Sequence, residues 1–400
     1  MSDDPRLYRR TFAVLSVVVG AGPLAVDSSL PAVRDMAEGL GTDMGSVQAT
    51  LGAFVAGVAA GQLVFGAMSD RFGRRPTLIL GLTAYVGAAL AIAFAHSIEP
   101  VVILRFIQGM GSAACFIVSR AVVRDQFDVA TTARLLASLF QVVSIYPVVC
   151  PIVAGELTQM FGWRAVYLFI AAVGGVGLLV NVAYLRETLA ERDRDALRVR
   201  RIAAAFVELF RDAAFRGYLA AGLGAFIGLM ILITAMPAVV VGHLGGTPAD
   251  VGYLYAIVMA IHLAAAALGS RLIRRLGVAR MIATGVSIVG LAAVATVIVA
   301  AADWVTPTSV VAVNALLMVG FAFTSPSMTA GALSNFHHMA GRATAVLGFV
   351  QQATGALTVF LIGITIDGTP RPHAIGMAVA GTLAFGAWFF LVRPLKHRTA

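Results

Sequence analysis

The sequence predicts an all-α membrane protein in which twelve transmembrane helices form two six-helix bundles. Hydrophobic residues make up 59% of the 400 residues, charged residues make up only 12%, and the mean hydropathy is +0.89. A soluble domain carries about 25% charged residues. Twelve apolar runs are each long enough to cross a bilayer, and one long polar stretch divides them into six and six.

The apolar runs have the length of helices rather than of barrel strands. A helix of about 20 residues crosses a hydrocarbon core of ~30 Å, whereas a barrel strand is half as long and alternates polar with apolar side chains, a pattern that this sequence lacks. The expected spans are 11–31, 47–67, 77–95, 100–120, 135–155, 164–185, 217–240, 249–269, 278–300, 306–330, 343–363 and 373–392. The first run contains Asp27 and is too long for a cleavable signal peptide, so we expect an uncleaved anchor.

Basic residues are unequally distributed between the two sides of this map. If both termini and the loops after even-numbered spans are cytoplasmic, every Lys and Arg lies on that side except Arg34, Arg164 and Arg371, which lie opposite, and Arg105, which lies inside a span. This asymmetry follows the positive-inside rule and predicts that both termini are cytoplasmic. It also accounts for the net charge of +9, so we expect no nucleic-acid partner.

Two charged residues lie deep inside predicted spans, where each costs about 2.5 to 3.5 kcal/mol on insertion scales. Asp27 lies near the outer end of the first helix, and Arg105 lies at a similar depth in the fourth. An ion pair would lower the insertion cost and leave a carboxyl able to bind and release a proton, so we predict a proton-coupling role for both residues. Alternatively, Asp27 caps the break at Pro31 and Arg105 snorkels to the outer surface.

The loop between the second and third spans, residues 66–76, concentrates charge and glycine. A glycine lets two helices approach closely, an aspartate can bond to helix-end amides or to an arginine, and arginines can hold a neighbouring helix end. We therefore predict a conformational latch formed by Gly66, Asp70, Arg71, Gly73, Arg74 and Arg75. A charge bias of cytoplasmic loops alone would explain the arginines but neither the glycines nor Asp70. A faint second copy at 270–277 lacks the acid.

The longest polar stretch, residues 186–216, is the expected seam between the two bundles. It predicts an N-terminal bundle at 1–190, a cytoplasmic linker at 191–213 and a C-terminal bundle at 214–400. Within it, Phe206, Leu209 and Phe210 recur at helical spacing beside arginines. This pattern is typical of a helix on an anionic membrane surface, and a solvated linker with some helix is the alternative.

Three motifs resemble those of a known family. Residues 66–75 resemble the loop 2-3 motif of the major facilitator superfamily, G-x-x-x-D-R-x-G-R-R. Residues 105–111 are similar to the R-x-x-Q-G-x-G motif on the fourth helix of proton-driven members, which implies that Arg105 helps proton transfer. Residues 27–32 are similar to the D-x-x-L-P-A end of the first helix in drug:proton antiporters of the bicyclomycin and chloramphenicol resistance (Bcr/CflA) type. Residues 123–125 and 162–164 are further echoes.

The resemblance implies the major facilitator fold and proton-coupled efflux of small amphipathic drugs across the bacterial inner membrane by alternating access. On the helices that carry these motifs, we expect Gln108, Gln141 and Tyr146 to line the substrate cavity. The fifth helix matches the antiporter pattern G-x-x-x-G-P only in part, through Pro147, Pro151 and Gly155.

The expected partners are a small lipophilic substrate, protons and the lipid bilayer, and we expect a monomer without cofactor or metal. From Gly217 onward the only acids are Asp250, Asp303 and Asp367, all at span edges or in loops. A dication site would want two deep carboxylates, so we expect neutral, zwitterionic or weakly acidic cargo.

Two other functions remain open at this stage. The partial match of the fifth helix favours uptake of a small metabolite by proton symport or uniport, and a non-transporting membrane sensor could share the fold. An enzyme is not expected, because no nucleophile, metal-ligand set or phosphate-binding loop occurs at a suitable spacing.

Overall fold

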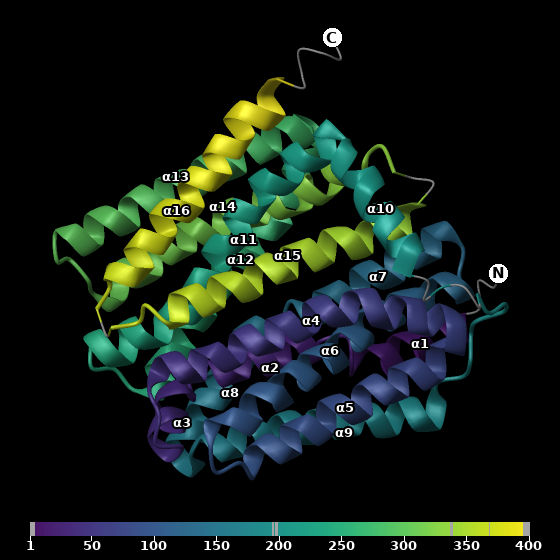
Figure 1. The fold of residues 1–400 in the computed structure, drawn as a ribbon, viewed down its shortest axis with the longest axis horizontal. Coiled ribbons are helices and arrows are strands. Elements are labelled where there is room, and N and C mark those ends of the chain that lie inside the picture. The colour runs from purple at the N-terminus through teal and green to yellow at the C-terminus, as the bar shows by residue number, and fades with distance from the viewer. Residues whose placement is uncertain (1–4, 194–195, 197–198, 337–338, 368, 395–400) are drawn as a thin grey trace. The chain divides into compact units, whose positions relative to one another are not determined.

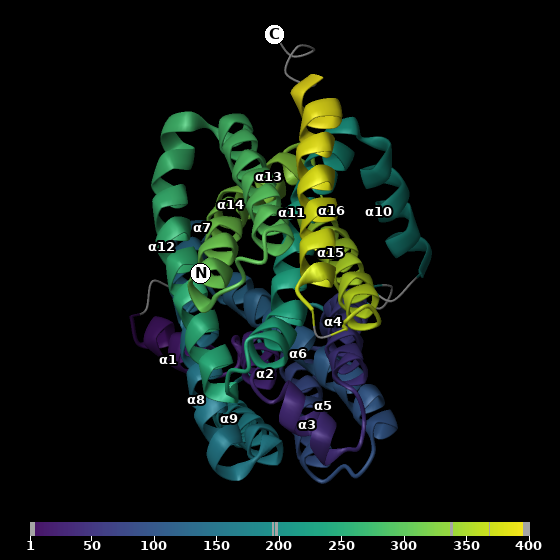
Figure 2. The same ribbon diagram turned by 90° about the vertical axis from the view of Figure 1, so that its left-hand side faces the viewer.

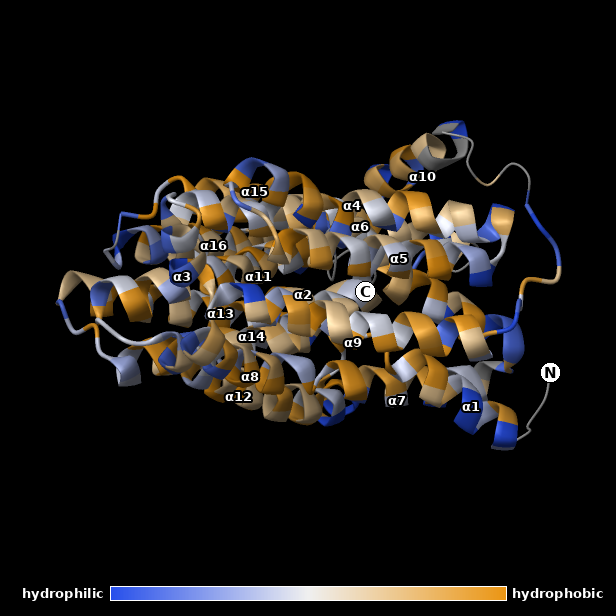
Figure 3. Cartoon of the chain, turned by 90° about the horizontal axis from the view of Figure 1, so that it is seen from below, coloured by the Kyte–Doolittle hydropathy of each residue, from blue (hydrophilic) through white to orange (hydrophobic). Residues whose placement is uncertain are grey.

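The computed structural model describes residues 5–193, 196, 199–336, 339–367 and 369–394. Over these residues the chain forms helices and no strands, and twelve helical segments are long and apolar enough to cross a membrane. The all-α fold and the number of spans are therefore confirmed, and the chain is a multi-pass membrane protein. Figure 3 shows hydrophobic residues along the helices and hydrophilic residues at helix ends, as at the start of α1.

The contacts divide the chain into two units, Met1–Arg201 and Ile202–Ala400. The helices of the first unit are α1 (Pro5–Ser16), α2 (Ala21–Ser29), α3 (Val33–Gly39), α4 (Met44–Phe72), α5 (Arg74–Ala93), α6 (Ile98–Gln126), α7 (Val129–Val143), α8 (Tyr146–Phe161) and α9 (Trp163–Tyr184). Within this unit α6 packs against α4 and α5, and α5 packs against α9, as Figure 1 shows.

The helices α4 and α6 are in backbone contact because glycines face each other across the pair. The space that a side chain on Gly57 would fill holds the Phe106 carbonyl, and the space beside Gly109 holds the Phe54 carbonyl. A larger residue at either position would overlap a peptide oxygen, so this approach requires glycine. It brings the Phe54 side of α4 to the part of α6 that carries Arg105.

Two spans of the first unit are interrupted. The first consists of α1 and α2, with four non-helical residues after Ser16, and the ring of Tyr146 fills the space beside Gly20 at this break. The fifth span consists of α7 and α8, and Tyr146 is the first residue of α8. The two breaks therefore meet, and they leave α2 as a separate short helix around Asp27.

The second unit is built around α11. Its helices are α11 (Ala213–Pro237), continued by the π-helix Ala238–His243, then α12 (Pro248–Leu276), α13 (Val278–Ala301), α14 (Pro307–Leu333), α15 (Ala340–Gly363) and α16 (Arg371–Ala387), continued by the π-helix Trp388–Val392. Helix α11 is buried along most of its length and packs against α14, α15 and α16, which Figure 2 shows from the side.

Helix α10 (Val199–Arg211) lies inside the predicted linker and packs on protein. Leu209 is fully buried, the ring of Phe206 meets Phe349 of α15 edge-on at 5.7 Å between centroids, and Phe210 meets Phe215 of α11 at 5.4 Å. The apolar face that suggested a membrane-surface helix is thus covered in large part by the second unit. At the other end of the linker, the Asp193 amide donates to the Asp70 carbonyl of α4 at 3.0 Å.

Candidate functional site

The guanidinium of Arg105 is completely buried against α2. Nη1 donates to the Ala25 carbonyl at 3.3 Å, and Nη2 donates to Ser29 Oγ at 3.1 Å. Because Ala25 and Ser29 bracket Asp27 in the chain, Arg105 lies at the level of Asp27 along this helix. The fourth membrane span (α6) and the end of the first span (α2) are therefore joined through the predicted proton-coupling arginine.

Asp27 is also buried, with 4% of its surface exposed. In a helix with 3.6 residues per turn, a residue points roughly 200° away from its second neighbour. The side chain of Asp27 therefore leaves α2 on a different face from that of Ser29, which accepts from Arg105. The structure places the two predicted residues at one level of the first unit, and a direct ion pair between them stays a prediction.

Two aromatic rings also lie against the Arg105 guanidinium. Its central carbon lies 4.8 Å from the centroid of Phe54 on α4 and 5.7 Å from the centroid of Tyr167 on α9. Cation–π contacts of this kind are worth about 2 kcal/mol when desolvated, which offsets part of the cost of burying the charge. The Arg105 side chain thus joins four helices of the first unit.

The predicted cavity residues lie in different surroundings. Gln108 is completely buried and accepts from Arg105 Nη1 at 2.9 Å, while its own Nε2 has no hydrogen-bond partner among the described residues. Gln141 is exposed on α7, and Tyr146 is half-buried at the start of α8 against Gly20. The structure therefore brings Gln108 to Arg105, whereas the hydrogen bonds of Arg105 involve neither Gln141 nor Tyr146.

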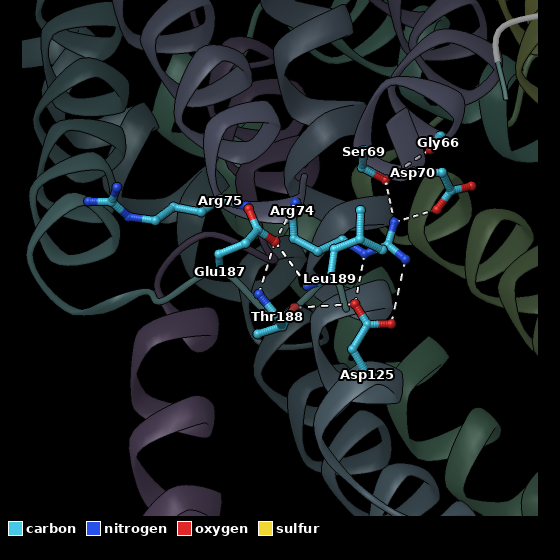
Figure 4. Close-up of polar contacts among 9 residues, drawn as sticks. All are labelled: Gly66, Ser69, Asp70, Arg74, Arg75, Asp125, Glu187, Thr188 and Leu189. Atoms are coloured by element: carbon cyan, nitrogen blue, oxygen red, sulfur yellow. Dashed lines mark hydrogen bonds and ion pairs between the residues drawn. The ribbon is translucent and has the colours of Figure 1, made fainter. Parts of the chain in front are cut away.

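The predicted latch is an ion cluster centred on Arg74 (Figure 4). Arg74 Nη1 donates to Asp70 Oδ1 at 2.5 Å and to Ser69 Oγ at 2.8 Å, and Arg74 Nε donates to Asp125 Oδ2 at 2.8 Å. Only 8% of the Arg74 side chain is exposed, compared with 51% for Asp70. Arg74 thus ties the end of α4 to the end of α6.

A carboxylate from a distant part of the chain caps the start of α5. Gly73 links α4 to α5 with φ of +114°, and Glu187, which is 113 positions after Arg74, accepts from the Arg74 amide at 2.9 Å and from the Arg75 amide at 3.2 Å. A side chain at Gly73 would overlap the Glu187 carboxylate. Acceptors at a helix N-terminus satisfy free amides and interact favourably with the helix dipole.

The environment of Glu187 favours its charged form. Burial raises the pKa of Glu187. The hydrogen bonds from the backbone amides of Leu189, Arg74, Thr188 and Arg75 together lower it by more, so the pKa lies below its usual value. Thr188 Oγ1 also donates to Asp125 Oδ2 at 3.2 Å, which joins this cap to the Arg74 cluster.

The other members of the predicted latch have smaller roles in the contacts. Arg75 Nη2 donates to the Val182 carbonyl near the end of α9 at 2.9 Å, and Arg71 is exposed. The expectation that Gly66 lets two helices approach closely was wrong, because a side chain there would meet only the Ile117 side chain at an ordinary 3.9 Å. Gly66 contributes its carbonyl, which accepts from Ser69 Oγ at 2.9 Å.

Two acids of this cluster were not among the predicted site residues. Asp125 belongs to the motif echo at residues 123–125, and Glu187 lies at the start of the polar stretch 186–216. The signal that could have found them is their sidedness, since both follow an even-numbered span and so reach the same membrane side as the loop 66–76.

Comparisons with known proteins agree with this architecture. The family model described as Major Facilitator Superfamily matches residues 15–359. The chain is 29% identical over 397 residues to the bicyclomycin resistance protein homolog of Haemophilus influenzae, with 98% of each chain covered. It is 28% identical over 376 residues to a chloramphenicol resistance protein of Pseudomonas aeruginosa, covering 91% of this chain and 86% of the relative.

Among solved structures, a POT family transporter in complex with 5-aminolevulinic acid superimposes with a TM-score of 0.80, covering 99% of this chain and 97% of that one. Its sequence identity is only 13%, so this likeness concerns the fold alone.

Proposed function

Because the chain belongs to the Major Facilitator Superfamily and is a membrane transporter rather than an enzyme, we propose that it exports small amphipathic drugs in exchange for protons. The support is that its relatives, which match most of the chain, are named as a bicyclomycin resistance protein homolog and a chloramphenicol resistance protein. Alternating access would take place in the bacterial inner membrane, with both termini in the cytoplasm and the chain acting as a monomer.

The observation that carries the coupling proposal is the buried acid of α2 at the level of a buried arginine. Asp27 would take a proton from outside and release it inside, and Arg105, bonded to both sides of Asp27 along α2, would adjust the affinity of that carboxyl for the proton. An inward gradient supplies about 1.4 kcal/mol per pH unit and about 2.3 kcal/mol per 100 mV for each charge moved. One proton per drug therefore suffices for modest concentrative export.

The ion cluster around Arg74 would act as the latch that stabilises the outward-facing state. It joins the ends of α4 and α6 and the start of α5 through Asp70, Asp125 and Glu187. Breaking several charge-assisted hydrogen bonds at once gives such a cluster two distinct states, which is what a conformational switch requires.

The cargo would be neutral, zwitterionic or weakly acidic, because the acids of the second half lie at span edges or in loops. Gln108, Gln141 and Tyr146 stay candidates for the cavity. Since Gln108 is buried on Arg105, it would meet cargo only after a rearrangement around that arginine.

Proton coupling is tested with Asp27→Asn in proteoliposomes. We expect the variant to abolish drug-dependent proton release, with chloramphenicol as the probe, while it elutes as a folded protein. Asp43→Asn is the matched control, because Asp43 is an exposed acid of the same unit that caps α4 by accepting from the Ser46 amide at 2.9 Å. Unchanged coupling in the Asp27 variant would refute the proposal.

Uptake by symport or uniport is the second candidate, and the incomplete proline pattern of α8 favours it. Pro147 lies at the start of this helix and Pro151 inside it, which gives only part of the antiporter pattern. Radiolabelled uptake by cells that express the chain, compared with their drug resistance, distinguishes the two directions. A non-transporting sensor would give neither.

A further inference from the structure

A second distant carboxylate caps a helix of the first unit, at the joint between α8 and α9. Gly162 links the two helices with φ of +79°, and the Trp163 amide at the start of α9 donates to Asp35 Oδ2 at 2.6 Å. Asp35 belongs to the short helix α3, 128 positions earlier. The joint therefore has the same parts as Gly73 and Glu187, a left-handed glycine followed by a helix whose first amide a remote acid accepts.

Helix α3 lies against the first two turns of α9 through more than this bond. The space that a side chain on Gly39 would fill holds the indole of Trp163, and the Tyr167 hydroxyl donates to Met36 Sδ at 3.9 Å. Trp163 is 2% exposed and Tyr167 is 1% exposed, so this is a packed contact. The bond from the Trp163 amide to the Asp35 carboxylate is the charge-assisted hydrogen bond of this contact.

The contact continues to Arg105. The rings of Trp163 and Tyr167 meet edge-on at 6.0 Å between centroids, and the Tyr167 ring lies 5.7 Å from the guanidinium carbon of Arg105. Three steps therefore lead from the Asp35 carboxylate to the arginine that bonds α2 on both sides of Asp27. Helix α3 also follows α2 in the chain after only three residues, so Asp35 restrains this segment from its far end.

The arginines next to Asp35 and Trp163 in the chain bind other groups. Arg164 donates to the Ala95 carbonyl at 2.9 Å and lies over the Trp163 ring at 4.4 Å, and Arg34 pairs with Glu38 at 2.9 Å. The amide at the start of α9, with the positive end of the helix dipole behind it, is thus the group that holds the Asp35 carboxylate.

We propose that Asp35 is a positioning residue for the proton site: by fixing the first turn of α9, it holds the Tyr167 ring against Arg105 and so sets the pH at which drug and proton exchange. The proposal rests on the proposed function for its transport part only. The clamp itself, meaning Asp35, Gly162, Trp163 and Tyr167, is a property of the folded chain and is measured separately.

The test compares Asp35→Ala, Asp35→Asn and the control Asp43→Ala in the purified full-length chain. Asp43 caps α4 in the same unit, and its substitution by alanine removes the same charge. Its carboxylate accepts from Ser46, three residues on, and not from a distant helix. Hydrogen exchange at residues 163–168 and 33–39 should become about fivefold faster in Asp35→Ala, less so in Asp35→Asn, which keeps an acceptor oxygen, and stay unchanged in Asp43→Ala.

Transport supplies the readout that a purely structural cap would not move. In liposomes, with chloramphenicol as the probe, the pH midpoint of drug-dependent proton release should shift by about half a unit or more in Asp35→Ala and be restored in part by Asp35→Asn, with no shift in Asp43→Ala. An unchanged midpoint together with faster exchange would overturn the positioning role.

Exchange in Asp35→Ala that matches the control would overturn the clamp, whatever transport shows. If the unaltered chain releases no protons on drug addition, the proposed function fails, and the exchange measurement still decides the clamp. Asp35→Asn keeps the comparison valid if Asp35→Ala does not fold.

Discussion

The joint between α4 and α5 and the joint between α12 and α13 share a backbone geometry and differ in what surrounds it. Gly73 has φ of 114° and ψ of 159°, and Gly277 has φ of 76° and ψ of 163°. Around Gly73, three carboxylates converge on Arg74 and on the start of α5. Around Gly277, the space beside the Cα is open and Arg274 and Arg275 are exposed.

The comparison shows that the glycine conformation turns the chain, whereas the surrounding charged side chains hold the turn in place. Both glycines occupy a region of backbone conformation that is essentially closed to other residues, and this alone lets one membrane helix follow another after a single residue. The acids add stabilisation at one of the two joints, where we have proposed the latch. The faint sequence copy at 270–277 has kept the turn and lacks the acid corresponding to Asp70.

The largest effect should come from removing the cation of the acid-rich joint. Arg74→Ala leaves Asp70 and Asp125 without the guanidinium that they share, while the backbone amide that Glu187 accepts from is kept. We expect a loss of about 3 kcal/mol in unfolding free energy, at the low end for a buried pair because Asp70 is half exposed. Denaturant unfolding in detergent measures it. Arg274→Ala at the other joint is the control and should change stability by less than about 0.5 kcal/mol. Equal losses in the two variants would show that the joints do not differ.

The glycines themselves sharpen the comparison. Gly277→Ala should cost about 1 kcal/mol, the low end for backbone strain alone, because nothing lies within 4 Å of the new Cβ. Gly73→Ala should cost about 1 kcal/mol more, because its Cβ also displaces the Glu187 carboxylate that caps α5. Thermal unfolding of both variants checks this order, and a larger loss at Gly277 would contradict it.

The smallest effect should be the pH dependence due to Glu187. Its pKa is lowered in the folded chain, so its stabilisation is present above the usual value of 4.5 and is lost as the pH falls through the folded pKa. As the pH is lowered from about 6 to about 3, the midpoint temperature of unfolding of Glu187→Gln should therefore fall less steeply than that of the unaltered chain. Glu191→Gln, at an exposed acid a few residues on, should behave like the unaltered chain. A parallel fall in all three proteins would remove Glu187 as the cause.

The architecture could be predicted from the sequence because the bilayer imposes it locally. Run length sets the number of spans, so all twelve could be counted, and the interruptions after Ser16 and Val143 were missed because they depend on the meeting of Gly20 with Tyr146 across helices. The loop 66–76 could be singled out by its composition. Sidedness places Glu187 on the same side of the membrane as this loop, but its bond to the Arg74 amide could not be predicted, since a cap 113 positions away leaves no spacing signal.

The same limit applies to the proposed proton site. Asp27 and Arg105 are conspicuous as charges inside apolar runs, which is a property of the sequence alone. That Arg105 bonds Ala25 and Ser29, and that Tyr167 lies on its guanidinium, depends on how α2, α6 and α9 are packed. The proposed role of Asp35 is invisible in the sequence for this reason, because its partner is a backbone amide, which carries no sequence signal.

The anchoring of the linker at both ends limits the reach of the chain between the units. Asp193 is bonded to the end of α4, and α10 is packed on α15 and α11 from Phe206 onward. Only the six residue steps from Asp193 to Val199 separate the first anchor from the start of α10. At 3.3 to 3.6 Å per residue, these steps span at most roughly 20 Å. A movement that carries the start of α10 farther than that from Asp193 therefore has to break the Asp193 bond or unwind the first turn of α10.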